Sequence, residues 1–208
     1  MGGFFITFEG IDGCGKSTHI DLFYKKLLED NQKVLMLREP GGTIISERIR
    51  EILLDKKNSG MSIQTELLLF EAARAQIVRE VIEPALAVGK IVLCDRYIDS
   101  SVAYQGYGRR IGRGTVDELN DYAIGRTRPD LTFLFDLDPD IAEGRKTCRS
   151  QDNDRLDEEG REFVTRTREG YLAVARDEPQ RIRVLDAKRD IDDLSREIYN
   201  IFKEVRTI

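Results

Sequence analysis

The stretch GIDGCGKS, residues 10–17, decides the fold of this 208-residue chain. It matches the pattern G-x-x-x-x-G-K-[ST] and follows FFITF, residues 4–8, an apolar run of strand length. An amphipathic pattern comes directly after it, with Ile20, Leu22, Phe23, Leu27 and Leu28. A strand, a glycine-rich loop and a helix in this order form a phosphate-binding loop, because the glycines let backbone N–H groups turn inward around phosphate oxygens. The sequence therefore predicts a nucleotide-binding loop rather than a chance glycine-rich turn.

The loop residues have separate tasks in holding a nucleotide. The helix that begins near Lys16 presents its positive end to phosphate, Lys16 reaches the terminal phosphates, and the Ser17 hydroxyl can ligate magnesium. The loop leaves the recipient of the phosphoryl group open, and water, a protein or a small acceptor all fit it. We expect ATP and Mg²⁺, with the ATP held by Gly10, Gly13, Cys14, Gly15, Lys16, Ser17 and Thr18.

Short apolar runs alternate with segments of helical periodicity along the rest of the chain. The runs lie at 33–37, 91–94, 131–137 and 182–185, and the helical segments lie around 43–55, 64–82, 115–124, 161–177 and 190–205. Alternation indicates parallel pairing, and nearly continuous apolar strands indicate a sheet that is covered on both faces. We predict a three-layer α/β fold with a five-stranded parallel sheet, in a single domain over residues 1–208.

Charge and composition limit the partners. The net charge of −5 argues against broad binding to nucleic acid, which needs many basic side chains. No apolar run is long enough to span a bilayer and no basic-then-apolar leader follows Met1, so we expect a cytoplasmic protein without membrane contact. The three cysteines form no CxxC pair and one histidine accompanies them, which disfavours zinc sites and disulfides.

Polar side chains follow the predicted strands at their carboxyl ends, where open α/β sheets bind ligands. Arg38 and Arg96 each stand at a strand exit, and their guanidinium groups suit phosphate oxygens. Surface ion pairs to Glu39 and Asp95 are the alternative. The segment DRYIDSSVAYQG, residues 95–106, suits neither a strand, a core helix nor an ordinary solvated loop, so we expect it to hold a ligand.

The predicted helix over 64–82 carries an arginine inside its apolar stripe. Arg74 follows Phe70 by four residues, so the two side chains share a face. A flat aromatic beside a flat donor suits stacking on a nucleobase and hydrogen bonding to its edge. The alternative is an arginine that extends to solvent.

Five motifs occur in one order along the chain: FEGIDGCGKST, REPGGT, LLFEAAR, DRYIDSSVAYQG and the dipeptide Asp154-Arg155. Together they resemble the bacterial thymidylate kinase family, P-loop nucleoside monophosphate kinases that phosphorylate dTMP. The likeness extends from the first strand to the last helix, and REPGG with DRYxxSxxAYQG is nearly diagnostic. The resemblance implies transfer of the γ-phosphoryl group of ATP to dTMP by a homodimer.

The resemblance also implies roles for the polar residues. Arg38 and Arg96 would bind the dTMP phosphate, and Tyr104 would crowd the place of a ribose 2′-hydroxyl. Asp12 would lie near the acceptor sugar and the metal, and Asp95 with Ser17 would hold magnesium directly or through water. The residues placed against the base are Phe70, Arg74, Ser101 and Gln105.

A polar stretch without a hydrophobic stripe, Thr147 to Glu159, reads as a mobile surface loop and forms most of a lid segment over about 145–159. Position 13 is glycine, and relatives with glycine there supply catalytic arginines from the lid. We expect Arg149 to be catalytic and Arg145 to rest on adenine, with Arg155 as the alternative to Arg149. The catalytic residues implied are then Asp12, Lys16, Arg96 and Arg149.

Two other functions compete with this one. A kinase for UMP, CMP or AMP would share the fold, but the pairs Phe70/Arg74 and Tyr104/Gln105 weigh against it. A GTP-hydrolysing switch would carry an N/TKxD motif for guanine, and the sequence has none. The helix over 64–82 is a candidate dimer surface, although its stripe equally suits a core.

Overall fold

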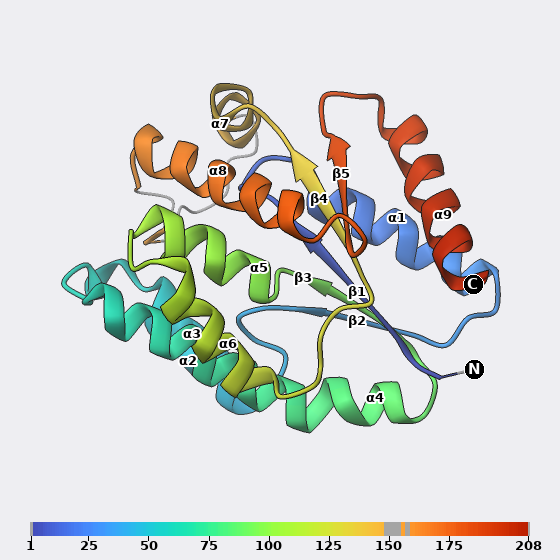
Figure 1. Ribbon diagram of the computed structural model, residues 1–208, viewed down its shortest axis with the longest axis horizontal. Coiled ribbons are helices and arrows are strands. Elements are labelled where there is room, and N and C mark those ends of the chain that lie inside the picture. Colours follow the sequence, from blue (N-terminus) through green and yellow to red (C-terminus); the bar gives the residue numbers. More distant parts are fainter. Residues whose placement is uncertain (1, 148–154, 157–158, 208) are drawn as a thin grey trace.

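The sheet lies at the centre of the molecule in a computed structural model that describes residues 2–147, 155–156 and 159–207. Within these residues five parallel strands run in the order β2-β3-β1-β4-β5 (Figure 1). The predicted strands are confirmed, each to within one residue at its ends. The strands are β1 (Phe4–Glu9), β2 (Val34–Arg38), β3 (Ile91–Asp95), β4 (Leu131–Asp136) and β5 (Ile182–Asp186).

Helices cover both faces of this sheet, as the apolar strands predict. The helices α1 (Lys16–Glu29) and α9 (Ile191–Thr207) pack on each other over one face. The other face is covered by α4 (Glu83–Ala87), α6 (Arg113–Ile124) and α8 (Arg161–Asp177), while α2 (Ile44–Leu54) packs against α3 (Ile63–Ile77) (Figure 1). The segment predicted as one helix over 64–82 is α3 followed by a π-helical stretch, Val78–Ile82.

Alternate side chains of the strands fill two cores. Ile6, Phe8 and Phe133 pack toward α1 and α9, whereas Phe5 and Val92 pack toward the opposite face. All five side chains are fully buried. This two-sided burial is why the strand runs are nearly continuous in apolar residues rather than alternating.

Besides α4 and a 3₁₀ turn at Lys56–Asn58, two helical segments lie outside the predicted ranges. The stretch DRYIDSSVAYQG becomes α5 (Ile98–Ser101) and a π-helical stretch, Val102–Gly108, and it is largely buried. The helix α7 (Pro139–Thr147) also forms, although its sequence PDIAEGRKT has no clear apolar stripe. In the first of these segments polar side chains are buried because other parts of the chain accept or donate their hydrogen bonds.

None of the helices in the described part of the chain has the length and apolar character needed to cross a membrane.

Candidate active site

The strand order reverses at β1, because β1 lies between β3 and β4. Parallel α/β sheets bind ligands at such a point, beyond the carboxyl ends of the strands. A polar cavity opens there, between the phosphate loop and the helices that follow β2 and β3. Its lining includes Asp12, Glu39, Pro40, Arg50, Phe70, Arg74, Arg96, Ser100, Ser101, Tyr104 and Gln105.

The phosphate loop connects β1 to α1 and is shaped by glycines. Gly10, Gly13 and Gly15 have φ angles of 139°, 83° and 96°, a region that glycine enters without steric cost. The Lys16 ammonium folds back over the loop and donates to the carbonyl oxygens of Gly10 at 2.9 Å and Ile11 at 3.2 Å. These contacts place the lysine at the rim of the loop from which α1 begins, and the Cys14 sulfur lies 3.7 Å from its ammonium.

One ion pair joins the phosphate loop to the polar cavity. Arg96 Nη2 donates to Asp12 Oδ1 at 2.6 Å and to the Tyr104 hydroxyl at 3.1 Å, and that hydroxyl donates to Asp12 Oδ2 at 3.0 Å. The guanidinium also lies over the Tyr104 ring, 4.9 Å from its centroid. Desolvation alone would raise the pKa of the Asp12 carboxyl, but Arg96 and Lys16 hold that pKa well below its usual range.

The other side of the Arg96 guanidinium contacts neutral oxygens. Nη1 donates to the Tyr171 hydroxyl at 3.1 Å, to the Gly10 carbonyl at 3.2 Å and to Ser100 Oγ at 3.3 Å. Both hydroxyls in turn donate to Glu9 Oε2, Ser100 at 2.6 Å and Tyr171 at 3.0 Å. Burial and the nearby Asp99 carboxylate raise the pKa of Glu9 to about 7.

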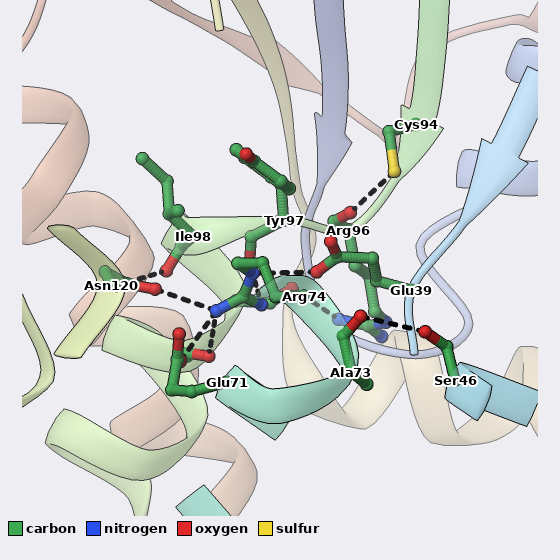
Figure 2. A network of polar contacts seen from close by, with 12 residues as sticks. Glu39, Ser46, Glu71, Ala73, Arg74, Cys94, Arg96, Tyr97, Ile98 and Asn120 are labelled. Carbon is green, nitrogen blue, oxygen red and sulfur yellow. Dashed lines mark hydrogen bonds and ion pairs between the residues drawn. The ribbon is translucent and has the colours of Figure 1, made fainter. Parts of the chain in front are cut away.

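Arg74 lies at the centre of a second, more enclosed cluster (Figure 2). Its side chain is 2% exposed, so it does not extend to solvent. Burial alone would lower its pKa, but Glu39 and Glu71 hold the guanidinium charged, with a pKa above the ordinary value. Burial also raises the pKa of Glu39 to about 7, against the lowering effect of Arg74. The acceptors of Arg74 are Glu39 at 2.8 Å, Glu71 and Asn120 at 2.7 Å, Ser101 at 2.9 Å and the Tyr97 carbonyl at 3.0 Å.

The cavity gathers most of the residues expected at the acceptor. Arg38 is the exception, since it does not line this cavity: it pairs with Glu47 at 3.0 Å and donates to the Pro40 carbonyl at 2.9 Å. Arg50 donates to the same carbonyl at 3.0 Å and does line the cavity. The surface pairs considered as the alternative, Arg38 with Glu39 and Arg96 with Asp95, do not form, because Glu39 pairs with Arg74 and Arg96 with Asp12.

Two oxygen donors that fit magnesium stand beside the phosphate loop. Ser17 Oγ lies 3.5 Å from Asp95 Oδ2. Asp95 Oδ1 is buried, and no described residue forms a hydrogen bond with it. A hydroxyl and a carboxylate next to a phosphate site match the oxygen donors that Mg²⁺ takes, with phosphate oxygens and water completing its shell.

The lid side of the site is partly described. Arg145, in the last turn of α7, donates to the Ala187 carbonyl at 3.1 Å, just beyond β5. Arg155 is buried, donates to the Leu53 carbonyl at 2.8 Å and pairs with Glu66 at 2.8 Å. Arg149 lies outside the described residues. The expectation of a surface loop is wrong at Arg155, because Glu66 and a backbone carbonyl draw it into the interior.

Glu66 connects that lid residue to the polar cavity. Its carboxylate accepts from Gln105 at 2.9 Å and from Arg109 at 3.1 and 3.0 Å, in addition to its ion pair with Arg155. Arg109 also bonds Glu159. Buried Glu66 and Arg109 were not predicted as site residues. Glu66 stands four residues before Phe70 and therefore on the same helix face, which is the signal that a sequence reading could have used.

Other proteins share both the sequence and the fold. The model of the thymidylate kinase family matches residues 8–198. The thymidylate kinase of Symbiobacterium thermophilum is 45% identical over 201 residues, covering 97% of this chain and 93% of that protein. That of Halothermothrix orenii is 48% identical over 205 residues and 98% of both chains. A crystal structure of thymidylate kinase from Ehrlichia chaffeensis superposes with a TM-score of 0.79 at 37% identity, covering 98% of this chain and 99% of that one. Matches of this identity and length, together with the loop and cavity geometry, show that the chain belongs to the thymidylate kinase family.

Proposed function

We propose that this chain transfers the γ-phosphoryl group of ATP to dTMP, giving ADP and dTDP, in the synthesis of dTTP. The observation that carries the proposal is Asp12, which belongs to the phosphate loop and also lines the polar cavity. A donor nucleotide held by the loop and an acceptor held in the cavity would therefore meet at one residue. Membership of the thymidylate kinase family gives the identity of the acceptor.

The chemistry requires alignment and charge neutralisation more than proton transfer. An oxygen of the dTMP phosphate attacks the γ-phosphorus, the bond from that phosphorus to the β,γ-bridging oxygen breaks, and the electron pair stays on ADP. The acceptor phosphate is already ionised at neutral pH, so the attack needs no general base. Lys16 would bind the donor phosphates and Arg96 the acceptor phosphate, which holds the two reacting oxygens in line.

Inside the cavity, the expected contacts follow from shape and donors. Phe70 would stack on thymine, and Arg74, Ser101 and Gln105 would border the base edge. Tyr104 would occupy the position of a ribose 2′-hydroxyl and favour the deoxy sugar. Arg50, which lines the cavity where Arg38 does not, would join Arg96 at the acceptor phosphate.

Magnesium would be held by Ser17 and by Asp95, directly or through water. Held there, Mg²⁺ would supply positive charge that offsets the charge of the transferring group. Arg149 remains the proposed catalytic arginine, because the ion pair of Arg155 with Glu66 turns that guanidinium toward the interior. Arg145, which donates to the Ala187 carbonyl just beyond β5, would rest on adenine.

A coupled assay that offers ATP with dTMP, dUMP, UMP, CMP, dCMP and AMP tests the reaction. We expect dTMP to give the highest kcat/KM, and faster turnover of UMP or AMP would refute the proposal. Lys16→Ala should abolish turnover of every acceptor, while wild-type activity in that variant would remove the phosphate loop from the reaction. Arg149→Ala should lower kcat with little change in the KM for dTMP; Arg155→Ala is its matched comparison.

We further propose a cytoplasmic homodimer built from one domain. Helices α2 and α3 expose large apolar side chains, among them Ile52 and Leu68, which is 54% exposed. Leu68→Arg should convert a dimer to a monomer in sedimentation velocity. Val88→Arg changes a residue at the end of α4 that is more exposed still, and it should leave the dimer intact. Monomeric wild-type protein would contradict the assembly.

A further inference from the structure

Three buried polar groups behind Arg96 have no part in the roles described above. Glu9 ends β1, Ser100 lies in α5 and Tyr171 lies in α8, and the hydroxyls of the last two both contact the Glu9 carboxylate. Both hydroxyls also accept from Arg96 Nη1. Burying a carboxylate and two hydroxyls is costly unless each is satisfied, so this arrangement is specific.

Counting protons fixes part of the hydrogen bonding in this group. A carboxylate has only acceptors, and a hydroxyl has one proton. The Ser100 and Tyr171 hydroxyls lie 2.7 Å apart and both contact Glu9 Oε2, so their two protons serve three contacts and at least one proton is directed to Glu9. A guanidinium has only donors, so both hydroxyl oxygens accept from Arg96. The Tyr97 N–H occupies the other carboxylate oxygen of Glu9 at 2.7 Å, which fixes the carboxylate itself.

The two hydroxyls hold one side of the Arg96 guanidinium and leave its other side facing the cavity. Nη1 is held by the two hydroxyls and the Gly10 carbonyl, while Nη2 faces Asp12 and Tyr104 at the cavity. The Arg96 backbone has a φ of 69°, in the left-handed region, so its side chain starts from a constrained position. An Arg96 without the hydroxyls would be drawn toward its remaining strong acceptor, Asp12.

We propose that Glu9 and Tyr171 are positioning residues, which fix the guanidinium of Arg96 so that it meets the phosphate of the acceptor nucleotide. They touch Arg96 through hydroxyl oxygens and do not touch the reacting atoms. The proposal rests on the proposed function, because it assigns to Arg96 the acceptor phosphate of that reaction.

Tyr171→Phe tests the role, with Tyr97→Phe as its matched control. The Tyr97 hydroxyl is also buried and donates to the Thr127 carbonyl at 2.9 Å, whereas the Tyr171 hydroxyl contacts Arg96, Ser100 and Glu9. In assays at pH 8 we expect Tyr171→Phe to raise the KM for dTMP about 10-fold, as the loss of one hydrogen bond to a charged group does. The KM for ATP should stay unchanged, and Tyr97→Phe should leave both constants unchanged.

Glu9→Gln gives an independent test, because an amide places an N–H₂ donor where the hydroxyls need an acceptor. It should raise the KM for dTMP as well, and the double variant with Tyr171→Phe should be no worse than Glu9→Gln alone, since both act through Arg96. The positioning role would be overturned if the two increases in the KM for dTMP multiplied in the double variant. It would also be overturned if the KM for ATP rose by as much as the KM for dTMP. A Tyr171→Phe enzyme that matches Tyr97→Phe in every constant would overturn it as well.

Activity of the wild-type enzyme distinguishes failure of the positioning role from failure of the proposed function. If the wild type does not phosphorylate dTMP, the proposed function fails and the role of Arg96 fails with it. If the wild type does so and Tyr171→Phe behaves as its control, only the positioning role fails.

Discussion

Arg74 and Arg96 line the same cavity, yet their surroundings differ in charge. Arg74 is clamped between two carboxylates, Glu39 and Glu71, which are themselves almost fully buried. Among the described residues, Arg96 pairs with one carboxylate, Asp12, whose side chain is 50% exposed, and otherwise contacts hydroxyls and a carbonyl. The charge of Arg74 is therefore neutralised within the protein, and we propose that Arg96 is the arginine that meets an anion. The number of carboxylates around each arginine, rather than its burial, supports this assignment.

The largest effect that this difference predicts is on catalysis. Arg96→Met should lower kcat/KM for dTMP by about 10³-fold, because paired hydrogen bonds from a guanidinium to phosphate are lost. The stability of the variant should change little, since the released Asp12 is accessible to water. Steady-state kinetics and thermal unfolding check the two halves of this prediction, and a fall in kcat/KM below 10-fold would contradict the assignment of the anion to Arg96.

The next effect is on stability. Arg74→Met should destabilise the fold by about 3–5 kcal/mol, because it leaves Glu39 and Glu71 buried without a cation. For a chain of this length that corresponds to a Tm lower by roughly 10 °C. Thermal unfolding measures it. An unchanged Tm with a loss in kcat/KM as large as that of Arg96→Met would show that base recognition, rather than the buried cluster, dominates at Arg74.

The same variant should show a stronger pH dependence of stability than the wild type, because Arg74 lowers the pKa of Glu39 and its loss lets that pKa rise further. Burial raises the pKa of Glu39 to about 7 in the folded protein, above the ordinary value of 4.5, so the fold takes up a proton that the unfolded chain releases. Such a group supports the fold below its unfolded pKa and loses that support as pH rises through the folded pKa. Arg74→Met should therefore be less destabilised at pH 5 than at pH 8. Urea unfolding at both values measures this, and an equal loss of stability at the two pH values would contradict it.

The smallest effects concern Tyr104, which belongs to the Arg96 cluster. Tyr104→Phe keeps the ring and removes the hydroxyl that contacts Arg96 and Asp12, so kcat/KM should fall only about 3- to 10-fold with the preference for deoxynucleotides retained. Tyr104→Ala removes the ring and should raise kcat/KM for ribothymidine monophosphate relative to that for dTMP. Competition assays with both sugars check this, and an equal ratio in the two variants would remove Tyr104 as the sugar gate.

The phosphate loop can be predicted from sequence because its contacts come from backbone groups and from residues adjacent along the chain. The strands can be predicted as well, since burial on both faces leaves a continuous apolar run. The Glu9 group cannot, because Ser100 and Tyr171 stand 91 and 162 positions from Glu9 and only the packing of α5 and α8 brings them together.

The arginines also differ in how far their surroundings can be predicted from the sequence. Both Arg38 and Arg96 stand at strand exits, but Arg96 lines the cavity whereas Arg38 turns to Glu47 in the following helix. Arg50 reaches the cavity from within α2, where neither a strand exit nor an apolar stripe marks it. The pairing of Arg74 with Glu39 and Glu71 depends on which carboxylates the fold brings within reach. The four-residue spacing from Phe70 predicts only that the two side chains share a helix face.

The glycine at position 13 has a consequence for how this enzyme can change through evolution. A Cβ there would lie 2.4 Å from the Ala142 carbonyl oxygen in α7, and its φ of 83° disfavours any side chain. A single substitution therefore does not give this lineage an arginine in the phosphate loop, because α7 would have to move in the same step. An arginine at position 13 therefore requires the phosphate loop and α7 to change together.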